Sequence, residues 1–149
     1  MRGCTVTEIA HLERCLECTL PESYKLYLET MGHSAGRLFT HDHLAVTYDH
    51  VLELRDQLLE GMSEPSDPSA SAFQLPTHAA VISGRLGDQF QYIVCNGQDD
   101  VPVLYVNSWD RRPKQCYPGI LAWLRAHEAM AVEAIREGYF DRYPNGTSP

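Results

Sequence analysis

The spacing of apolar residues changes once along this 149-residue chain, and the change limits the folds that it can adopt. Up to about residue 61, apolar residues recur every three or four positions, which is typical of amphipathic helices. From residue 79 onward, large apolar residues alternate with polar ones, as at 89–95, which is typical of strands with one buried face. Helices followed by neighbouring strands predict a segregated α+β fold on an antiparallel meander.

Two helices are predicted near the N-terminus, at about 6–17 and 20–31. Thr5 and Glu8 fit a capping box, in which a hydroxyl and a carboxylate three residues later satisfy free N–H groups reciprocally. The segment 19–22 repeats this signature, with a proline in the first helical turn. Both helices therefore have start signals as well as an apolar stripe.

The middle of the chain carries weaker signals. The segment 36–40 is short and predicts an edge strand. Asp49 is expected to cap a third helix, which Gly61 ends. The segment 62–72 is rich in Ser and Pro and has no apolar periodicity, so a mobile loop is predicted there.

Three strands are predicted in the second half, at 79–83, 89–95 and 101–107. The last of these is apolar on both faces, which favours a central position in the sheet. A final helix is predicted from Pro118 to Gly138, since proline suits a first turn and glycine a helix end. The residues expected to pack inward from this helix are Ile120, Leu121, Trp123, Leu124, Met130 and Ile135.

The charge balance argues against a general nucleic-acid binder. The chain has 12 Lys and Arg residues against 20 Asp and Glu, a formal net charge of −8 at pH 7. Neutralising phosphates requires a basic surface, which this balance does not supply. The acidity either keeps the protein soluble or matches a basic partner.

A cytoplasmic protein with reduced thiols is expected. No stretch approaches the roughly 20 apolar residues of a membrane helix, and the N-terminus lacks the apolar run of a signal peptide. The five cysteines are odd in number and show no repeated spacing, so a disulfide scaffold is not predicted.

Several short motifs resemble the SUKH superfamily, whose founding members are the yeast Smi1/Knr4 proteins. The segment Leu20 to Lys25, followed by Met31-Gly32, resembles the opening of that family. The turn at Gly87 to Phe90 and the helix at Tyr117 to Leu124 fall where the family has its second half. The resemblance covers about residues 5–138.

The resemblance implies one non-enzymatic binding domain over residues 1–149, with a frayed tail at 141–149. Bacterial members are mostly immunity proteins, which neutralise a co-encoded polymorphic toxin, often a nuclease, in the producer's cytoplasm. We therefore expect a monomer or weak homodimer that binds a basic cognate toxin. The alternative is a Smi1/Knr4-like regulatory or scaffolding protein linked to cell-wall and glucan synthesis.

Two groups of carboxylates are candidates for contacting a basic partner. The third predicted helix carries four acids, three or four residues apart, with only Arg55 opposing them: Asp49, Glu53, Asp56 and Glu60. A second patch is expected from a hairpin loop and neighbouring strand ends: Asp88, Asp99, Asp100 and Asp110. Each group is either a solvated polar surface or an electrostatic match to a cationic toxin.

Trp109 is a further candidate contact. It follows a strand and lies between polar residues, so it either caps the core or anchors a partner from an exposed position. Together, the predicted partner-binding residues are Asp88, Gln91, Asp99, Asp100, Trp109, Asp110, Glu53 and Asp56.

No metal, cofactor or catalytic site is predicted. Two groups contain possible metal ligands, one at His33, His41, Asp42 and His43 and one at His11, Cys15 and Cys18. Zinc sites usually combine two separated ligand pairs, and no second pair follows either group at a fitting distance. No nucleophile elbow, phosphate-binding loop or dinucleotide motif is present, and no histidine is positioned by sequence beside Cys95.

Overall fold

The computed structural model describes residues 1–39, 44–63 and 72–144. Over these residues the protein has five helices and one five-stranded sheet, and none of the helices is long and apolar enough to cross a membrane. The elements in chain order are α1 (Val6–Leu16), α2 (Glu22–Met31), β1 (Leu44–Ala45), α3 (Tyr48–Gly61), β2 (Ala79–Arg85), β3 (Gln89–Val94), β4 (Val103–Asn107), β5 (Lys114–Tyr117), α4 (Ile120–Arg136) and α5 (Tyr139–Arg142).

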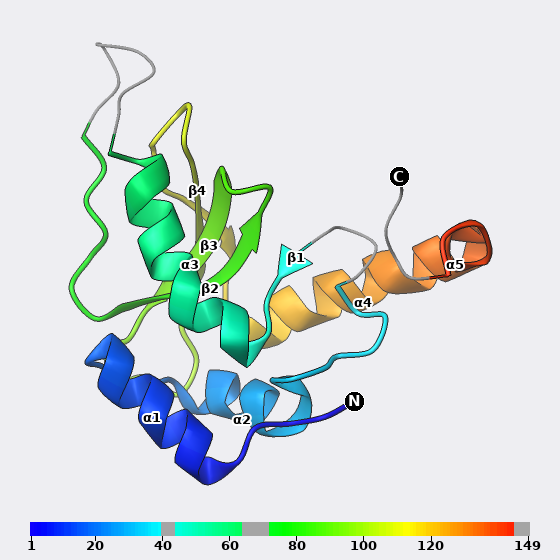
Figure 1. The fold of residues 1–149 in the computed structure, drawn as a ribbon, viewed down its shortest axis with the longest axis horizontal. Coiled ribbons are helices and arrows are strands. Elements are labelled where there is room, and N and C mark those ends of the chain that lie inside the picture. Colours follow the sequence, from blue (N-terminus) through cyan, green and yellow to red (C-terminus); the bar gives the residue numbers. More distant parts are fainter. Residues whose placement is uncertain (40–43, 64–71, 145–149) are drawn as a thin grey trace.

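The sheet is an antiparallel meander, so the predicted α+β class is confirmed (Figure 1). Its strands lie side by side in chain order, and each pairs antiparallel with the next. The β2–β3 connection is a tight turn in which Leu86 (φ 54°) and Gly87 (φ 75°) both have positive φ, as the type I′ hairpin turn requires. The sequence order of the strands is thereby also their spatial order.

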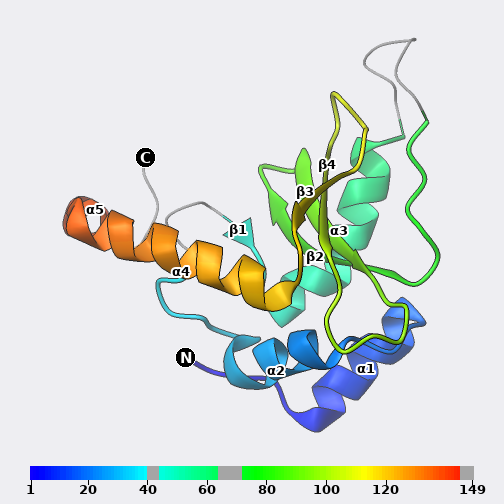
Figure 2. The ribbon, with the colours of Figure 1, turned by 180° about the vertical axis from the view of Figure 1, so that it is seen from behind.

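Helices cover both faces of the sheet, α3 on one and the start of α4 on the other (Figures 1 and 2). Phe90 points toward α3, where a side chain at Gly84 would collide with Leu54. Gln91, the next residue, points to the other face and bonds Trp123 of α4. The prediction that β3 buries one face only is therefore wrong, because α4 covers the second face.

An aromatic cluster joins α2, α4 and the segment before β1. Trp123 is fully buried, with its ring 5.5 Å from Tyr27 edge-on and 5.1 Å from Phe39 in a stacked arrangement. Tyr24 stacks on Tyr27 from the preceding turn of α2. Edge-to-face and offset stacks of this kind stabilise a core beyond the area that they bury.

The helix starts agree with the sequence at α1 and differ at α2 and α3. At α1 the capping box is present, because Thr5 and Glu8 bond each other's backbone N–H groups. The second capping signature is wrong, since Pro21 is the N-cap of α2 and makes no side-chain cap bond. Similarly, Thr47 rather than Asp49 is the N-cap of α3, and Asp49 lies in its first turn.

Two strand predictions need correction. The segment 36–39 forms turns rather than the expected edge strand, and Thr40 lies outside the described residues. The sheet instead ends in β1 on one side and β5 on the other. The four residues of β5 are mostly exposed and show no apolar alternation, so the sequence carried no signal for it.

Two predicted segments fall largely outside the described residues. Only the ends of the predicted loop 62–72 are described, and Met62 there is buried. Of the predicted frayed tail 141–149, Asp141 and Arg142 belong to α5. The remaining loop residues, 64–71, and the last five residues of the tail are not described.

Helix α4 departs in part from the predicted inward packing. Ile120 and Trp123 are buried as expected, but Leu121 and Ile135 are about half exposed, at 50% and 51%. Met130 is exposed as well. The ribbon shows that the second half of α4 projects beyond the sheet, so the sheet does not cover Met130 and Ile135 (Figures 1 and 2).

Candidate functional site

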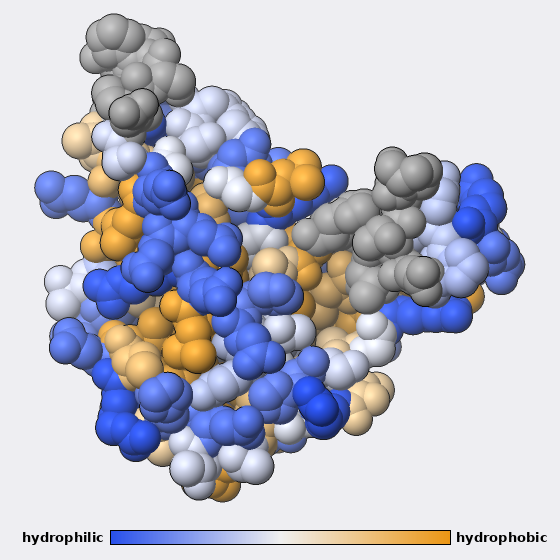
Figure 3. Space-filling view, viewed as in Figure 1, coloured by the Kyte–Doolittle hydropathy of each residue, from blue (hydrophilic) through white to orange (hydrophobic). Residues whose placement is uncertain are grey.

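A stripe of carboxylates runs along the outer face of α3. Its members, the acidic stripe, are Asp49, Glu53, Asp56 and Glu60. Spacings of four, three and four residues keep side chains on one face of a helix with 3.6 residues per turn. All four are exposed, and within the described ranges none lies in an ion pair. The view onto α3 shows hydrophilic residues gathered over this helix (Figure 3).

The opposite face of α3 fixes the acidic stripe in place. Val51, Leu54 and Leu58 are at most 1% exposed and belong to the core cluster. Buried apolar residues at helical spacing lock the helix against β2, so the stripe is carried on a rigid support. Of the predicted partner-binding residues, Glu53 and Asp56 thus remain free to meet a partner.

The meander splits the second predicted patch into two. In a meander, successive turns lie at alternate ends of the sheet. Asp88 (β2–β3 turn) and Asp110 (β4–β5 turn) therefore lie at one end, and Asp99 and Asp100 (β3–β4 loop) at the other. The prediction of a single patch from these four residues is wrong.

Asp100 stabilises the start of α4. Its Oδ1 accepts hydrogen bonds from the backbone N–H of Ile120 at 2.8 Å and from the hydroxyl of Ser23 at 2.7 Å. A carboxylate at this position caps the N-terminus of α4 and complements the helix dipole. A Cβ at Gly119 would collide with the same carboxylate, which explains the glycine. Asp99 lies beside it and is exposed.

At the other end of the sheet, the carboxylate of Asp110 is also engaged. Asp110 pairs with Lys114 at 2.8 Å and more loosely with Arg112 at 3.8 Å. The hydrogen bond from Lys114 lowers the pKa of Asp110. Asp88 is half-buried, and its backbone oxygen accepts the N–H of Ser108 at 2.9 Å. The charge of Asp110 is therefore already balanced by nearby cations.

Gln91 links the sheet to α4 through hydrogen bonds. Its Oε1 accepts hydrogen bonds from Trp123 Nε1 and from Ser83 Oγ, both at 2.8 Å. These bonds satisfy the polar groups of a largely buried interface. A role for Gln91 in holding α4 on the sheet follows directly from this geometry, and its candidacy as a partner contact is weakened.

Trp109 is exposed at the end of the sheet that lies beside the C-terminal end of α3. Its exposed fraction is 54%, so the alternative that it caps the core is wrong. The hydrogen bond between Ser108 and Asp88 joins its turn to the β2–β3 turn, where Leu86 is 74% exposed. Gly61, at the end of α3, lies against the same turn. We call Trp109 and Leu86 the turn edge. These two residues extend the exposed surface of α3 beyond its C-terminal end.

One surface was missed by sequence reasoning, an apolar groove of about 450 Å³ between α2 and α4. Leu26 and Leu121 are both exposed there, at 58% and 50%. The acids that line the groove are Glu22, Glu29, Asp99 and Asp100. Leu121 was expected to pack inward, and only the packing of the two helices shows that it remains outside, whereas Leu26 lies off the predicted apolar stripe of α2.

Cys4, Glu8 and His33 have their potential ligand atoms within 4.8 Å of one another. The two oxygens of Glu8 are already used, one by Thr5 and one by His33 Nε2 at 2.9 Å. These bonds lower the pKa of Glu8 to about 2, and burial raises the pKa of the Cys4 thiol to about 11. The group is a hydrogen-bonded junction between the N-terminus, α1 and the end of α2.

Of the two metal-ligand groups considered from the sequence, only His11, Cys15 and Cys18 lie wholly within the described residues. His41, Asp42 and His43 of the other group lie outside the described residues, and His33 contacts Glu8 and the ring of Tyr48. His11 contacts Cys15, with 3.5 Å between Nε2 and Sγ. Cys18 instead faces away toward Cys95.

Comparison with known proteins identifies the fold family. The model of the SMI1 / KNR4 family (SUKH-1) matches residues 3–126, which span α1, every described strand and the first turns of α4. The matched range contains the Leu20 to Lys25 segment and the Gly87 to Phe90 turn that carry the resemblance to SUKH proteins. A search of curated proteins returns no match.

Proposed function

We propose that this chain, which belongs to the SMI1/KNR4 (SUKH-1) family, is a non-enzymatic immunity protein that neutralises a cognate toxin in the bacterial cytoplasm. Family membership supports a binding domain. The observation that carries the proposal for this particular chain is the acidic stripe, four exposed carboxylates without ion-pair partners in the described structure.

The charge of the stripe suits a nuclease toxin. A nuclease that binds phosphates presents Lys and Arg at its active surface. An acidic helix of complementary potential speeds the encounter with that surface and disfavours other partners. It would also occupy the place of the nucleic acid, so binding alone would inhibit the toxin.

The turn edge supplies apolar contacts beside the charges. Exposed Trp residues are frequent hot spots of protein interfaces, and Trp109 and Leu86 lie next to the C-terminal end of α3. A stable interface buries about 800 Å² on each partner. The α3 face together with the turn edge forms one surface on which such an area can be built.

Growth rescue tests the proposal. The toxin to use is the C-terminal domain of a large secreted protein encoded beside this gene, expressed alone and with the present chain. We expect growth to be restored by the wild type and lost with Glu53→Lys/Asp56→Lys. The matched control is Glu128→Lys/Glu137→Lys, which changes the net charge equally at an exposed position of α4 and at its exposed C-cap and should still rescue.

The alternative from the same family match is a Smi1/Knr4-like regulatory or scaffolding role in cell-wall synthesis. It predicts that the wild type gives no rescue against any neighbouring toxin domain. Rescue by the wild type and equally by both double variants would retain the immunity function but contradict the acidic stripe as its binding surface.

A further inference from the structure

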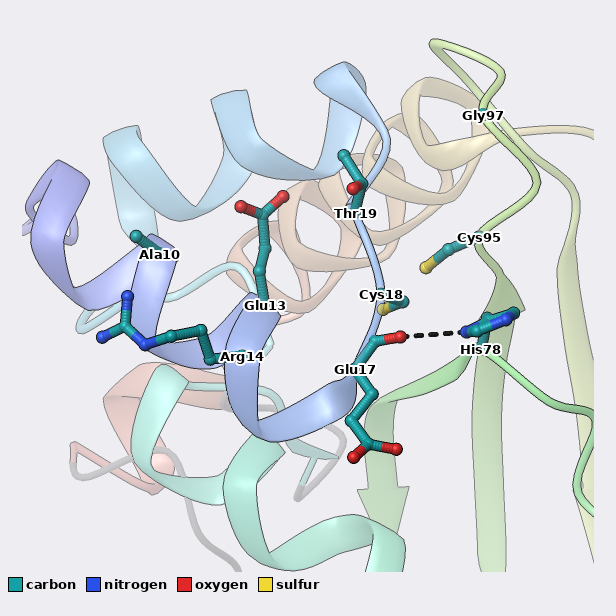
Figure 4. Close-up of a pocket in the computed structure, with 9 residues that line it drawn as sticks. All are labelled: Ala10, Glu13, Arg14, Glu17, Cys18, Thr19, His78, Cys95 and Gly97. Carbon is teal, nitrogen blue, oxygen red and sulfur yellow. Dashed lines mark hydrogen bonds between the residues drawn. The ribbon is translucent and has the colours of Figure 1, made fainter.

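Two thiols from distant parts of the chain meet at an open pocket of about 700 Å³ (Figure 4). Cys18 follows α1 and Cys95 follows β3, and both line the pocket. Their thiol groups lie close enough to influence each other's ionisation. Both residues are only partly buried, so the pair is reachable from solvent.

The backbone on each side of the thiol pair is held in an uncommon conformation. Glu17, just before Cys18, has φ 52°, and His78, paired with Cys95, has φ 59°. At Glu17 this conformation ends α1 as a left-handed C-cap, whereas at His78 it is rare for a non-glycine residue. His78 Nδ1 donates to the Glu17 carbonyl at 2.9 Å, and Cys95 N–H donates to the His78 carbonyl at 3.0 Å. These bonds connect the two cysteine-bearing segments directly.

The two thiols are not equivalent. Interaction with the Cys95 thiol lowers the pKa of Cys18, against the opposing effects of burial and of Glu13. The same interaction and burial raise the pKa of Cys95, and Glu13 adds to this rise. Cys18 is therefore the thiol that ionises first, and the thiolate is the nucleophile in disulfide exchange.

We propose that Cys18 and Cys95 form a redox-active dithiol that reacts with low-molecular-weight disulfides such as oxidised glutathione. The Cys18 thiolate attacks one sulfur of the reagent, whose S–S bond breaks and releases one thiolate. Cys95 then gives up its proton and attacks the Cys18 sulfur, displacing the second thiolate. Two protein thiols are oxidised to one disulfide, and the two thiol protons end on two reduced reagent molecules.

The closed disulfide would join the α1–α2 connection to the end of β3. It would span the wall of the pocket that both residues line. The other cysteines have no thiol partner in the described structure, since Cys15 and Cys116 are exposed separately and Cys4 is buried. They serve as internal references for reactivity.

Peptide mapping tests the proposal. Trypsin would place Cys15 and Cys18 on one peptide, 15–25, so the experiment uses the Cys15→Ser variant. The folded protein is treated with oxidised glutathione, blocked with N-ethylmaleimide and digested. We expect peptide 15–25 joined to peptide 86–111, which carries Cys95, with a mass two hydrogens below the sum of the two.

Single substitutions separate the two roles. In Cys95→Ser, glutathione should remain on Cys18 as a mixed disulfide, at least tenfold more than in the protein with both thiols. In Cys18→Ser, the amount of glutathione bound to Cys95 should be at least tenfold lower than the amount bound to Cys18 in Cys95→Ser. Absence of the joined peptide from the Cys15→Ser protein would overturn the proposal. The proposal would also be overturned if glutathione reacted with Cys18 no faster than with the exposed Cys116.

Discussion

Helices α3 and α4 lie on opposite faces of the same sheet and present opposite kinds of surface. α3 buries large apolar residues along its length and exposes carboxylates. α4 buries Ile120 and Trp123 near its start, but its second half buries small alanines and exposes Val132 and Ile135. The difference teaches that helical spacing alone does not decide burial, because burial also requires a layer to pack against.

The largest expected effect tests whether α4 is anchored only at its start. Replacing fully buried Trp123 with Ala should lower the free energy of unfolding by about 3–5 kcal/mol. It removes the centre of the aromatic cluster and one of the two donors to Gln91 Oε1, leaving the Ser83 hydroxyl. Ile135→Ala should change the free energy by about 0.5 kcal/mol or less. Urea titration followed by circular dichroism measures the free energy of unfolding of both variants. Equal losses would contradict the difference between the start and the second half of α4.

A smaller effect is expected at the N-terminal cap of α4. Asp100→Ala should cost about 1–2 kcal/mol, since the helix loses its capping carboxylate. Asp99→Ala, one residue away, is the matched control and should be close to neutral. The same urea titration applies. A loss at Asp99 as large as that at Asp100 would contradict the assignment of the cap.

An acid-dependent effect distinguishes an engaged carboxylate from the acidic stripe. The folded protein lowers the pKa of Glu8 from 4.5 to about 2, chiefly through the Thr5 backbone N–H. A depressed pKa stabilises the fold above the unfolded value and loses that stabilisation as the pH falls toward 2. Glu8→Gln should therefore flatten the fall in stability between about pH 4.5 and pH 2. Urea midpoints across this range test it, and an unchanged slope would contradict the role of Glu8.

The sequence predicted features that depend on neighbours along the chain. The capping box of α1, the amphipathic α3 and the alternation in β3 are local patterns, and each produced an element. Element order then followed, because short connections between strands favour a meander.

What the sequence did not predict depends on contacts between distant residues. Asp100 caps a helix that begins 20 residues later, and Cys95 meets a thiol 77 residues earlier. The short, exposed strand β5 carries no periodic signal. The separation of Asp88 from Asp99 was implied by the predicted meander, since its turns alternate between the two ends of the sheet.

The central claim is that the acidic stripe of α3, rather than the apolar second half of α4, meets the partner. The most direct test is the association rate with the cognate toxin domain at low salt, measured by stopped flow. Glu53→Lys/Asp56→Lys should slow association by about tenfold or more, and Glu128→Lys/Glu137→Lys much less. Equal rates for the two double variants would contradict the account.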